Sequence, residues 1–92
     1  MAAMPKLLFT PQLRRFTNTP EVQSSASTLR GALNDAFAIN PQLRGYVLDE
    51  QGHVRPNVVV FIDGQRQDER TELLQPLAAT STVYVLQALS GG

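Results

Sequence analysis

The sequence of 92 residues contains no cysteine and no tryptophan, and His53 is its only histidine. Without cysteine the chain cannot form a disulfide, use a thiol as a nucleophile or bind zinc or an iron–sulfur cluster through thiolates. His53 lies in a polar stretch with no base or nucleophile beside it, so we expect it to have no catalytic role. The sequence therefore predicts a protein without catalytic residues of its own.

An excess of charge of one sign is also missing, because eight basic residues balance eight acidic ones and like charges form no run. Proteins that bind nucleic acid usually carry a basic excess or stripe, and modules that bind membrane surfaces carry polybasic segments. The sequence predicts neither kind of partner. No apolar run is long enough for a transmembrane helix, and the one near the start is too short for a signal peptide, so we expect a cytoplasmic protein.

Two pairs of adjacent carboxylates, Asp49-Glu50 and Asp68-Glu69, are candidate sites for acid–base chemistry or a metal ion. Neighbouring side chains in a regular element do not face each other, so we interpret both pairs as parts of solvated turns. The sequence also lacks a glycine-rich loop of the kind that holds a phosphate. No metal site and no bound cofactor are predicted.

What is present is a chain with 42% hydrophobic and 17% charged residues, which is typical of one small globular domain. The pattern predicts strands over 7–10, 21–24, 58–62, 65–67 and 82–89, a helix from residue 29 to the Asn40-Pro41 pair, and a shorter helical piece over 43–48. Leu29, Leu33, Ala36 and Phe37 share one face of the first helix, and Ser27 or Thr28 can cap it. We expect an α+β domain in which one main helix crosses a mixed sheet of four or five strands.

The segment 58–62 is the strongest strand signal, because it is β-branched and apolar on both faces, and we expect it inside the sheet. Asp63-Gly64 favours a tight hairpin turn, so 65–67 should return as an exposed edge strand. The irregular segment that follows should turn its three leucines inwards, namely Leu73, Leu74 and Leu77.

The sequence ends in Ser90-Gly91-Gly92, directly after the last predicted strand. Glycine has no Cβ, so such an end can adopt conformations closed to other residues and enter a narrow channel. We expect a domain over residues 1–89 and a flexible tail over 90–92.

From Ser27 onwards the sequence resembles the small sulfur carriers of the ThiS/MoaD type, which have the ubiquitin-like β-grasp fold. The resemblance is carried by the helix, by the blocks 46–56, 58–64 and 83–92, and by the terminal Gly91-Gly92 pair. The stretch from Arg55-Pro56 to Asp63-Gly64 is similar to a block of the longer carriers, which include the small subunits of molybdopterin synthase.

The resemblance implies a function for the last carboxyl group. The carboxylate of Gly92 is ionised at neutral pH and is a poor electrophile, so in this family an E1-like enzyme uses ATP to form an acyl-adenylate. A sulfur donor then displaces AMP and leaves a thiocarboxylate, which passes sulfur to an accepting synthase or large subunit. The carrier itself is a protein cosubstrate, without catalytic residues.

The resemblance also implies that the apolar residue six positions before the end, Leu86, contacts a partner. No charged side chain occurs after Glu72, and strand alternation places Tyr84 and Leu86 on the face away from the helix. We therefore expect partner contacts at Leu86, Leu89 and Tyr84. Arg55 and Arg66, which flank the strand predicted over 58–62, are further candidate contacts.

Other functions stay open. The protein could be the small subunit of molybdopterin synthase, a narrower form of the same hypothesis. It could instead be a ubiquitin-like modifier, for which the single lysine, Lys6, argues against long self-linked chains. A non-covalent β-grasp binding module with incidental terminal glycines is the third alternative.

Overall fold

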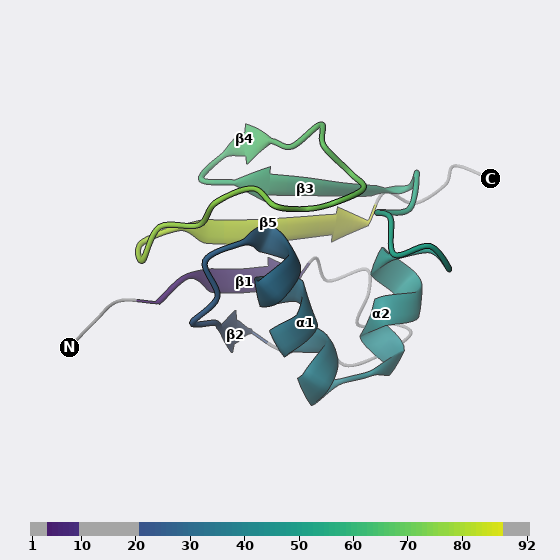
Figure 1. Ribbon diagram of the computed structural model, residues 1–92, viewed down its shortest axis with the longest axis horizontal. Coiled ribbons are helices and arrows are strands. Elements are labelled where there is room, and N and C mark those ends of the chain that lie inside the picture. Colours follow the sequence, from purple (N-terminus) through teal and green to yellow (C-terminus); the bar gives the residue numbers. More distant parts are fainter. Residues whose placement is uncertain (1–3, 10–20, 88–92) are drawn as a thin grey trace.

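The computed structural model describes residues 4–9 and 21–87, which form a sheet with two helices (Figure 1). The elements in chain order are β1 (Lys6–Phe9), β2 (Val22–Gln23), α1 (Leu29–Ile39), α2 (Gln42–Val47), β3 (Val58–Ile62), β4 (Gln65–Arg66) and β5 (Thr82–Gln87). Both predicted helices and all five predicted strands are confirmed. Of the strands predicted over 7–10 and 82–89, Thr10, Ala88 and Leu89 lie outside the described residues.

The five strands form one mixed sheet in the order β2-β1-β5-β3-β4. The last strand, β5, is central: it pairs parallel with β1 and antiparallel with β3. Parallel strands need a long crossover between them, and here the chain between β1 and β5 includes α1 and α2, which lie on the same side of the sheet (Figure 1). The expected mixed sheet with a helix across one face is thus confirmed.

The core lies between the helices and the inner face of this sheet, and alternate strand residues enter it. Val83 and Val85 of β5 are both 0% exposed, and they meet a helix face on which Leu29, Leu33, Ala36 and Phe37 are buried as predicted. A strand places alternate side chains on opposite faces, so burial of Val83 and Val85 leaves Tyr84 and Leu86 on the outer face.

Local signals in the sequence begin and end α1. The N-cap is Thr28, whose hydroxyl accepts a hydrogen bond from the backbone N–H of Gly31 at 3.2 Å. The helix ends at Ile39 with Asn40 in an extended conformation, because the residue before Pro41 is disfavoured in the helical region. Neither helix within the described ranges is long and apolar enough to cross a membrane.

The hairpin between β3 and β4 forms as predicted. Asp63 and Gly64 have φ values of 51° and 82°, which such a tight turn requires, and the Asp63 carboxylate accepts a hydrogen bond from the N–H of Thr82. β3 lies between β5 and β4, whereas β4 is exposed at the sheet edge.

One expectation about the irregular segment after β4 is wrong. Leu73 and Leu77 are buried, but Leu74 is 61% exposed. Leu73 has a φ of 61°, and the carboxylate of Glu69 accepts its N–H at 2.7 Å. This left-handed turn buries Leu73 and leaves Leu74 in solvent.

Candidate functional site

The outer face of the sheet carries partly exposed apolar side chains on its three middle strands. The register sets Tyr84 opposite Leu8 of β1 and Phe61 of β3, and sets Leu86 opposite Val59. All five side chains are partly exposed, whereas their neighbours along each strand, apart from Gln87, are buried in the core. We call these five residues the outer apolar face.

Sequence reasoning found Tyr84 and Leu86 of this face but missed Leu8, Val59 and Phe61. The signal was present, since the segment 58–62 is apolar at every position although only one of its faces packs against the helices. Contiguous apolar side chains left open to solvent commonly mark a surface for another protein. The outer apolar face is therefore the candidate docking surface of this molecule.

The outer apolar face lies along the strand that leads to the end of the sequence. Leu86 is the second-last residue of β5, and Gln87 pairs with Val58 at the beginning of β3. The predicted tail residues Ser90, Gly91 and Gly92 lie outside the described residues, as does Leu89, which was predicted to contact a partner. The sequence has five residues after Gln87, and an extended chain of that length spans about 17 Å.

Solved structures with a similar fold match this chain over almost its whole length and over almost the whole of their own. Small archaeal modifier protein 1 from Haloferax volcanii has a TM-score of 0.75 at 19% identity, over 98% of this chain and 100% of its own. Small archaeal modifier protein 1 from Methanosarcina acetivorans has a TM-score of 0.77 at 19% identity, over 100% of this chain and 99% of its own. A chain of the BexX/CysO complex from Amycolatopsis orientalis has a TM-score of 0.77 at 15% identity, over 96% of this chain and 99% of its own.

This is a ubiquitin-like β-grasp domain. The fold expected from the resemblance to the ThiS/MoaD type is confirmed, and the structural neighbours are ubiquitin-like proteins of that type. No protein-family model matches the sequence, and no curated protein matches it. At 15–19% identity, the similarity establishes the β-grasp fold.

The two arginines predicted to flank the docking surface lie at opposite ends of β3. Arg66 is exposed on edge strand β4, opposite Phe61 of the outer apolar face. Arg55 precedes β3, and its Nε donates a hydrogen bond of 2.7 Å to the carbonyl of Gly45 in α2. The fold does not bring Arg55 and Arg66 together, and their contact with a partner stays a prediction.

One carboxylate of each adjacent pair, Asp49 and Glu69, accepts hydrogen bonds from backbone N–H groups. Asp49 Oδ1 accepts the N–H groups of His53 at 3.0 Å and of Gln51 at 2.9 Å, and these bonds lower the pKa of Asp49. Within the described ranges, no three acidic or histidine side chains gather as a metal ion would require. The interpretation of Asp49-Glu50 as part of a turn agrees with this geometry.

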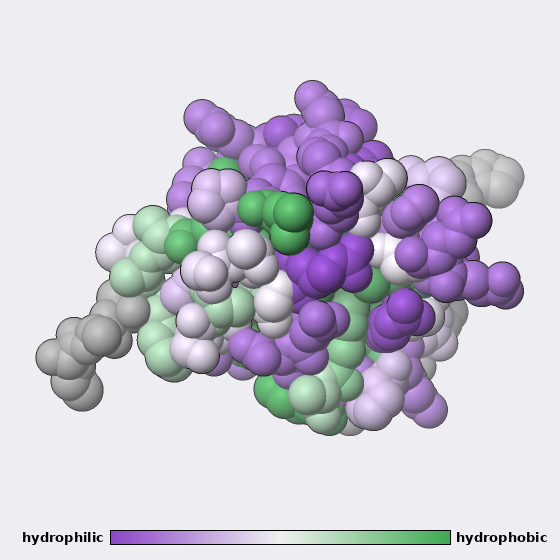
Figure 2. All heavy atoms as spheres, viewed as in Figure 1, coloured by the Kyte–Doolittle hydropathy of each residue, from purple (hydrophilic) through white to green (hydrophobic). Residues whose placement is uncertain are grey.

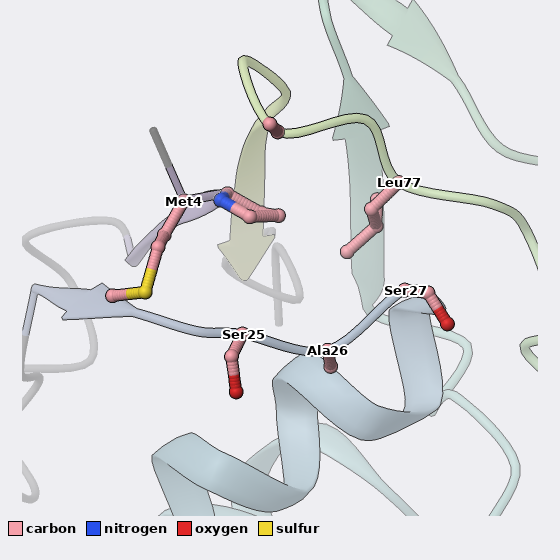
Figure 3. Close-up of a pocket in the computed structure, with 7 residues that line it drawn as sticks. Met4, Ser25, Ala26, Ser27 and Leu77 are labelled. Carbon is pink, nitrogen blue, oxygen red and sulfur yellow. The ribbon is translucent and has the colours of Figure 1, made fainter. Parts of the chain in front are cut away.

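Two shallow pockets open at opposite ends of the sheet. One of about 360 Å³ lies where β1 begins and is lined by small or apolar residues, with Leu77 pointing into it (Figure 3). The other, of about 310 Å³, is lined by Asp49, Glu50, Gln51 and Arg55 beside the turn before β3. Neither lining brings a nucleophile together with a base.

Proposed function

We propose that this β-grasp protein is a sulfur carrier whose Gly92 carboxylate is activated by an E1-like enzyme and converted to a thiocarboxylate. The observation that carries the proposal is the position of β5. It is the central strand of a β-grasp sheet, it displays Leu86 on an open apolar face, and it leads within five residues to Gly91-Gly92. Small carriers and modifiers share this fold.

The chemistry needs little from the carrier beyond an accessible carboxyl group. A carboxylate oxygen of Gly92 attacks the α-phosphorus of ATP, pyrophosphate leaves, and the acyl-adenylate forms. A sulfide-level nucleophile then adds to the carbonyl carbon and expels AMP, which gives the thiocarboxylate without any change of oxidation state. Neither Gly91 nor Gly92 has a Cβ, so no side chain of theirs hinders the attack of the carboxylate on ATP or the attack of sulfide on the terminal carbonyl.

Docking on the outer apolar face would hold the domain while the tail enters the active site of the enzyme. Tyr84 and Leu86 lie on the strand that precedes the tail, and Val59 and Phe61 widen the surface on β3. The sequence has no charged side chain after Glu72, so desolvating this strand buries no ionised side chain of its own.

The test is an intact-mass measurement after incubation with the E1-like enzyme of the same cell, ATP and sulfide. We expect the mass to rise by the difference between one sulfur and one oxygen. A matched control carries a few extra residues after Gly92, which should block the gain but leave the thermal unfolding midpoint unchanged. The proposal fails if the enzyme loads another carrier but not this one, or if protein purified from its own cells continues past Gly92.

A ubiquitin-like modifier is the second candidate, and similarity to small archaeal modifier protein 1 favours it. In that function an amine of a target protein, rather than sulfide, would displace AMP from the Gly92 adenylate. Lys6, the only lysine, lies on β1 in an ion pair of 3.4 Å with Glu21. High-mass conjugates in cell extract that vanish when Gly92 is deleted would select the modifier, and their absence beside a detected thiocarboxylate would select the carrier.

A further inference from the structure

Two arginines from different helices converge on one glycine on the helix-bearing side of the domain. Arg30 belongs to α1 and Arg44 to α2, and Gly52 lies in the turn that follows α2, with a φ of 81°. A methyl group placed on Gly52 would lie 3.6 Å from Nη1 of Arg30 and 3.8 Å from Nη2 of Arg44. Its three nearest atoms would all be guanidinium nitrogens, so two cationic side chains converge over Gly52, which is buried. We call this junction of Arg30, Arg44 and Gly52 the notch.

Neither cation is neutralised. Within residues 4–9 and 21–87, no carboxylate lies within 4.0 Å of Arg30 or Arg44, and the ion pair found there joins Lys6 to Glu21. Like charges repel, and an arrangement that holds two of them at one point without a counter-ion has an electrostatic cost. That cost is relieved when an anion binds between them.

The two arginines differ in how firmly they are held. Arg30 donates through Nε to the carbonyl of Glu72 at 2.9 Å and through Nη2 to the carbonyls of Gly52 at 3.0 Å and Thr71 at 2.7 Å. Its Nη1 has no acceptor among the described residues, and the exposed side chain of Arg44 has none either. The notch thus combines a fixed guanidinium, whose orientation is set by three backbone carbonyls, with a second one that is free to close on a ligand.

We infer that this notch, formed by Arg30, Arg44 and Gly52, is a binding site for an oxyanion, a phosphate or carboxylate group. Guanidinium groups present paired N–H donors that match the oxygens of both anions, and such charge-assisted hydrogen bonds are stronger than neutral ones. An oxygen seated above Gly52 would accept from Arg30 Nη1 and Arg44 Nη2 together.

The notch and the outer apolar face lie on opposite sides of the sheet. Figure 2 looks onto the helices, and hydrophilic side chains gather in the upper and right-hand parts of this view. The outer apolar face is turned away from the helices, so a partner seated there leaves the notch open. The oxyanion site is therefore independent of the proposed sulfur-carrier function, and each can fail without the other.

The test is a titration of the full chain, labelled with ¹⁵N, at pH 7 and constant ionic strength. One arm adds inorganic phosphate and the other adds acetate, with chloride replaced in equal ionic strength. We expect saturable shifts of the Gly52 amide and of the side-chain Nε–H signals of Arg30 and Arg44. Binding by phosphate alone would identify a phosphate-bearing ligand, and binding by acetate alone would identify a carboxylate.

The decisive variant is Arg44→Gln, because the Arg44 side chain donates no hydrogen bond within the described part of the fold. We expect its affinity for the bound anion to fall at least tenfold while its unfolding midpoint stays that of the wild type. Arg66→Gln removes the same charge from β4 at the sheet edge and should bind as the wild type does. The inference is overturned if neither anion gives saturable shifts, or if Arg44→Gln and Arg66→Gln weaken binding equally.

Discussion

At the scale of single residues, the carboxylate of Glu69 accepts several hydrogen bonds from the residues that directly follow it. Its carboxylate accepts the N–H groups of Thr71, Glu72 and Leu73 and the hydroxyl of Thr71, at distances of 2.6–2.8 Å. Hydrogen bonds to the ionised form favour it, and they lower the pKa of Glu69 from 4.5 to about 2. One exposed side chain thereby organises the turn that buries Leu73.

This shift predicts how stability depends on pH. A carboxyl group whose pKa is lowered by folding stabilises the native state fully above its unfolded pKa, and the contribution is lost as pH falls through the folded pKa. Glu69→Gln should therefore lower the urea unfolding midpoint at pH 7. Its difference from the wild type should shrink as pH falls from 4.5 towards 2.

Asp68→Asn provides the control for Glu69→Gln. Asp68 is also exposed and adjacent in sequence, but its carboxylate accepts no hydrogen bond from the described residues. Its substitution should change the midpoint little and equally at every pH. Parallel pH profiles for the two variants would contradict the role assigned to Glu69.

At the scale of elements, two glycines with open surroundings separate backbone conformation from packing. An added Cβ would meet no atom within 4 Å at Gly45 or at Gly64, but Gly45 lies within α2 and Gly64 has a φ of 82° in the hairpin turn. Gly45→Ala should stabilise the protein by about 0.5–1 kcal/mol, because alanine loses less backbone entropy in a helix. Gly64→Ala should destabilise it by about 1–2 kcal/mol, because its Cβ opposes a left-handed backbone.

Urea unfolding of both variants measures these opposite effects. Since neither methyl group meets a neighbour, the difference in sign comes from the backbone alone. If both variants changed the free energy of unfolding in the same direction, either the turn between β3 and β4 or the helix α2 would relax away from the described conformation.

The elements themselves were largely predictable, because their signals are local. The Thr28 cap, the stop before Pro41 and the Asp63-Gly64 turn each act over a few residues, and the structure confirms all three. The failure at Leu74 has a different origin. The Leu73 N–H donates a hydrogen bond to the Glu69 carboxylate that holds Leu73 in a left-handed conformation, and the pattern of hydrophobic residues does not predict this bond.

Contacts between segments far apart in the chain could not be predicted from the sequence. Arg30 reaches the carbonyls of Glu72 and Thr71 across 42 and 41 positions, and Arg70 donates to the carbonyls of Arg55 and Val58. An arginine that donates to backbone carbonyls pairs with no particular side chain, so the sequence contains no residue type that indicates its partner. The convergence of Arg30 and Arg44 on Gly52 was unpredictable for the same reason, as was the full outer apolar face, which needs the register of β1 against β5.

At the scale of the whole molecule, the β-grasp domain separates stability from the proposed chemistry. Its core lies on the helix side of the sheet, whereas the outer apolar face lies on the other side. Substitutions on the outer apolar face should therefore change docking more than folding. The sequence after Gln87 should supply the reacting carboxyl group and contribute no core residue that the described domain needs.

This separation predicts that a chain lacking Gly91 and Gly92 becomes a competitive inhibitor. It keeps the outer apolar face and so should occupy the E1-like enzyme, but it presents no terminal glycine to ATP. Added to a loading reaction, it should raise the apparent KM for the wild-type carrier and leave kcat unchanged.

Leu86→Ser in the shortened chain is the matched variant for this inhibition. Leu86 is partly exposed and lies outside the core, so its replacement should lower the free energy of unfolding by about 1 kcal/mol and leave the domain folded. Inhibition should weaken about tenfold or more, since a few side chains that lose all their water near the centre of an interface contribute most of its binding energy, and we place Leu86 among them. If the shortened chain does not inhibit at all, the enzyme holds the carrier by its tail alone and the outer apolar face is not its docking surface. If Leu86→Ser inhibits as strongly as its parent, docking uses another part of the domain.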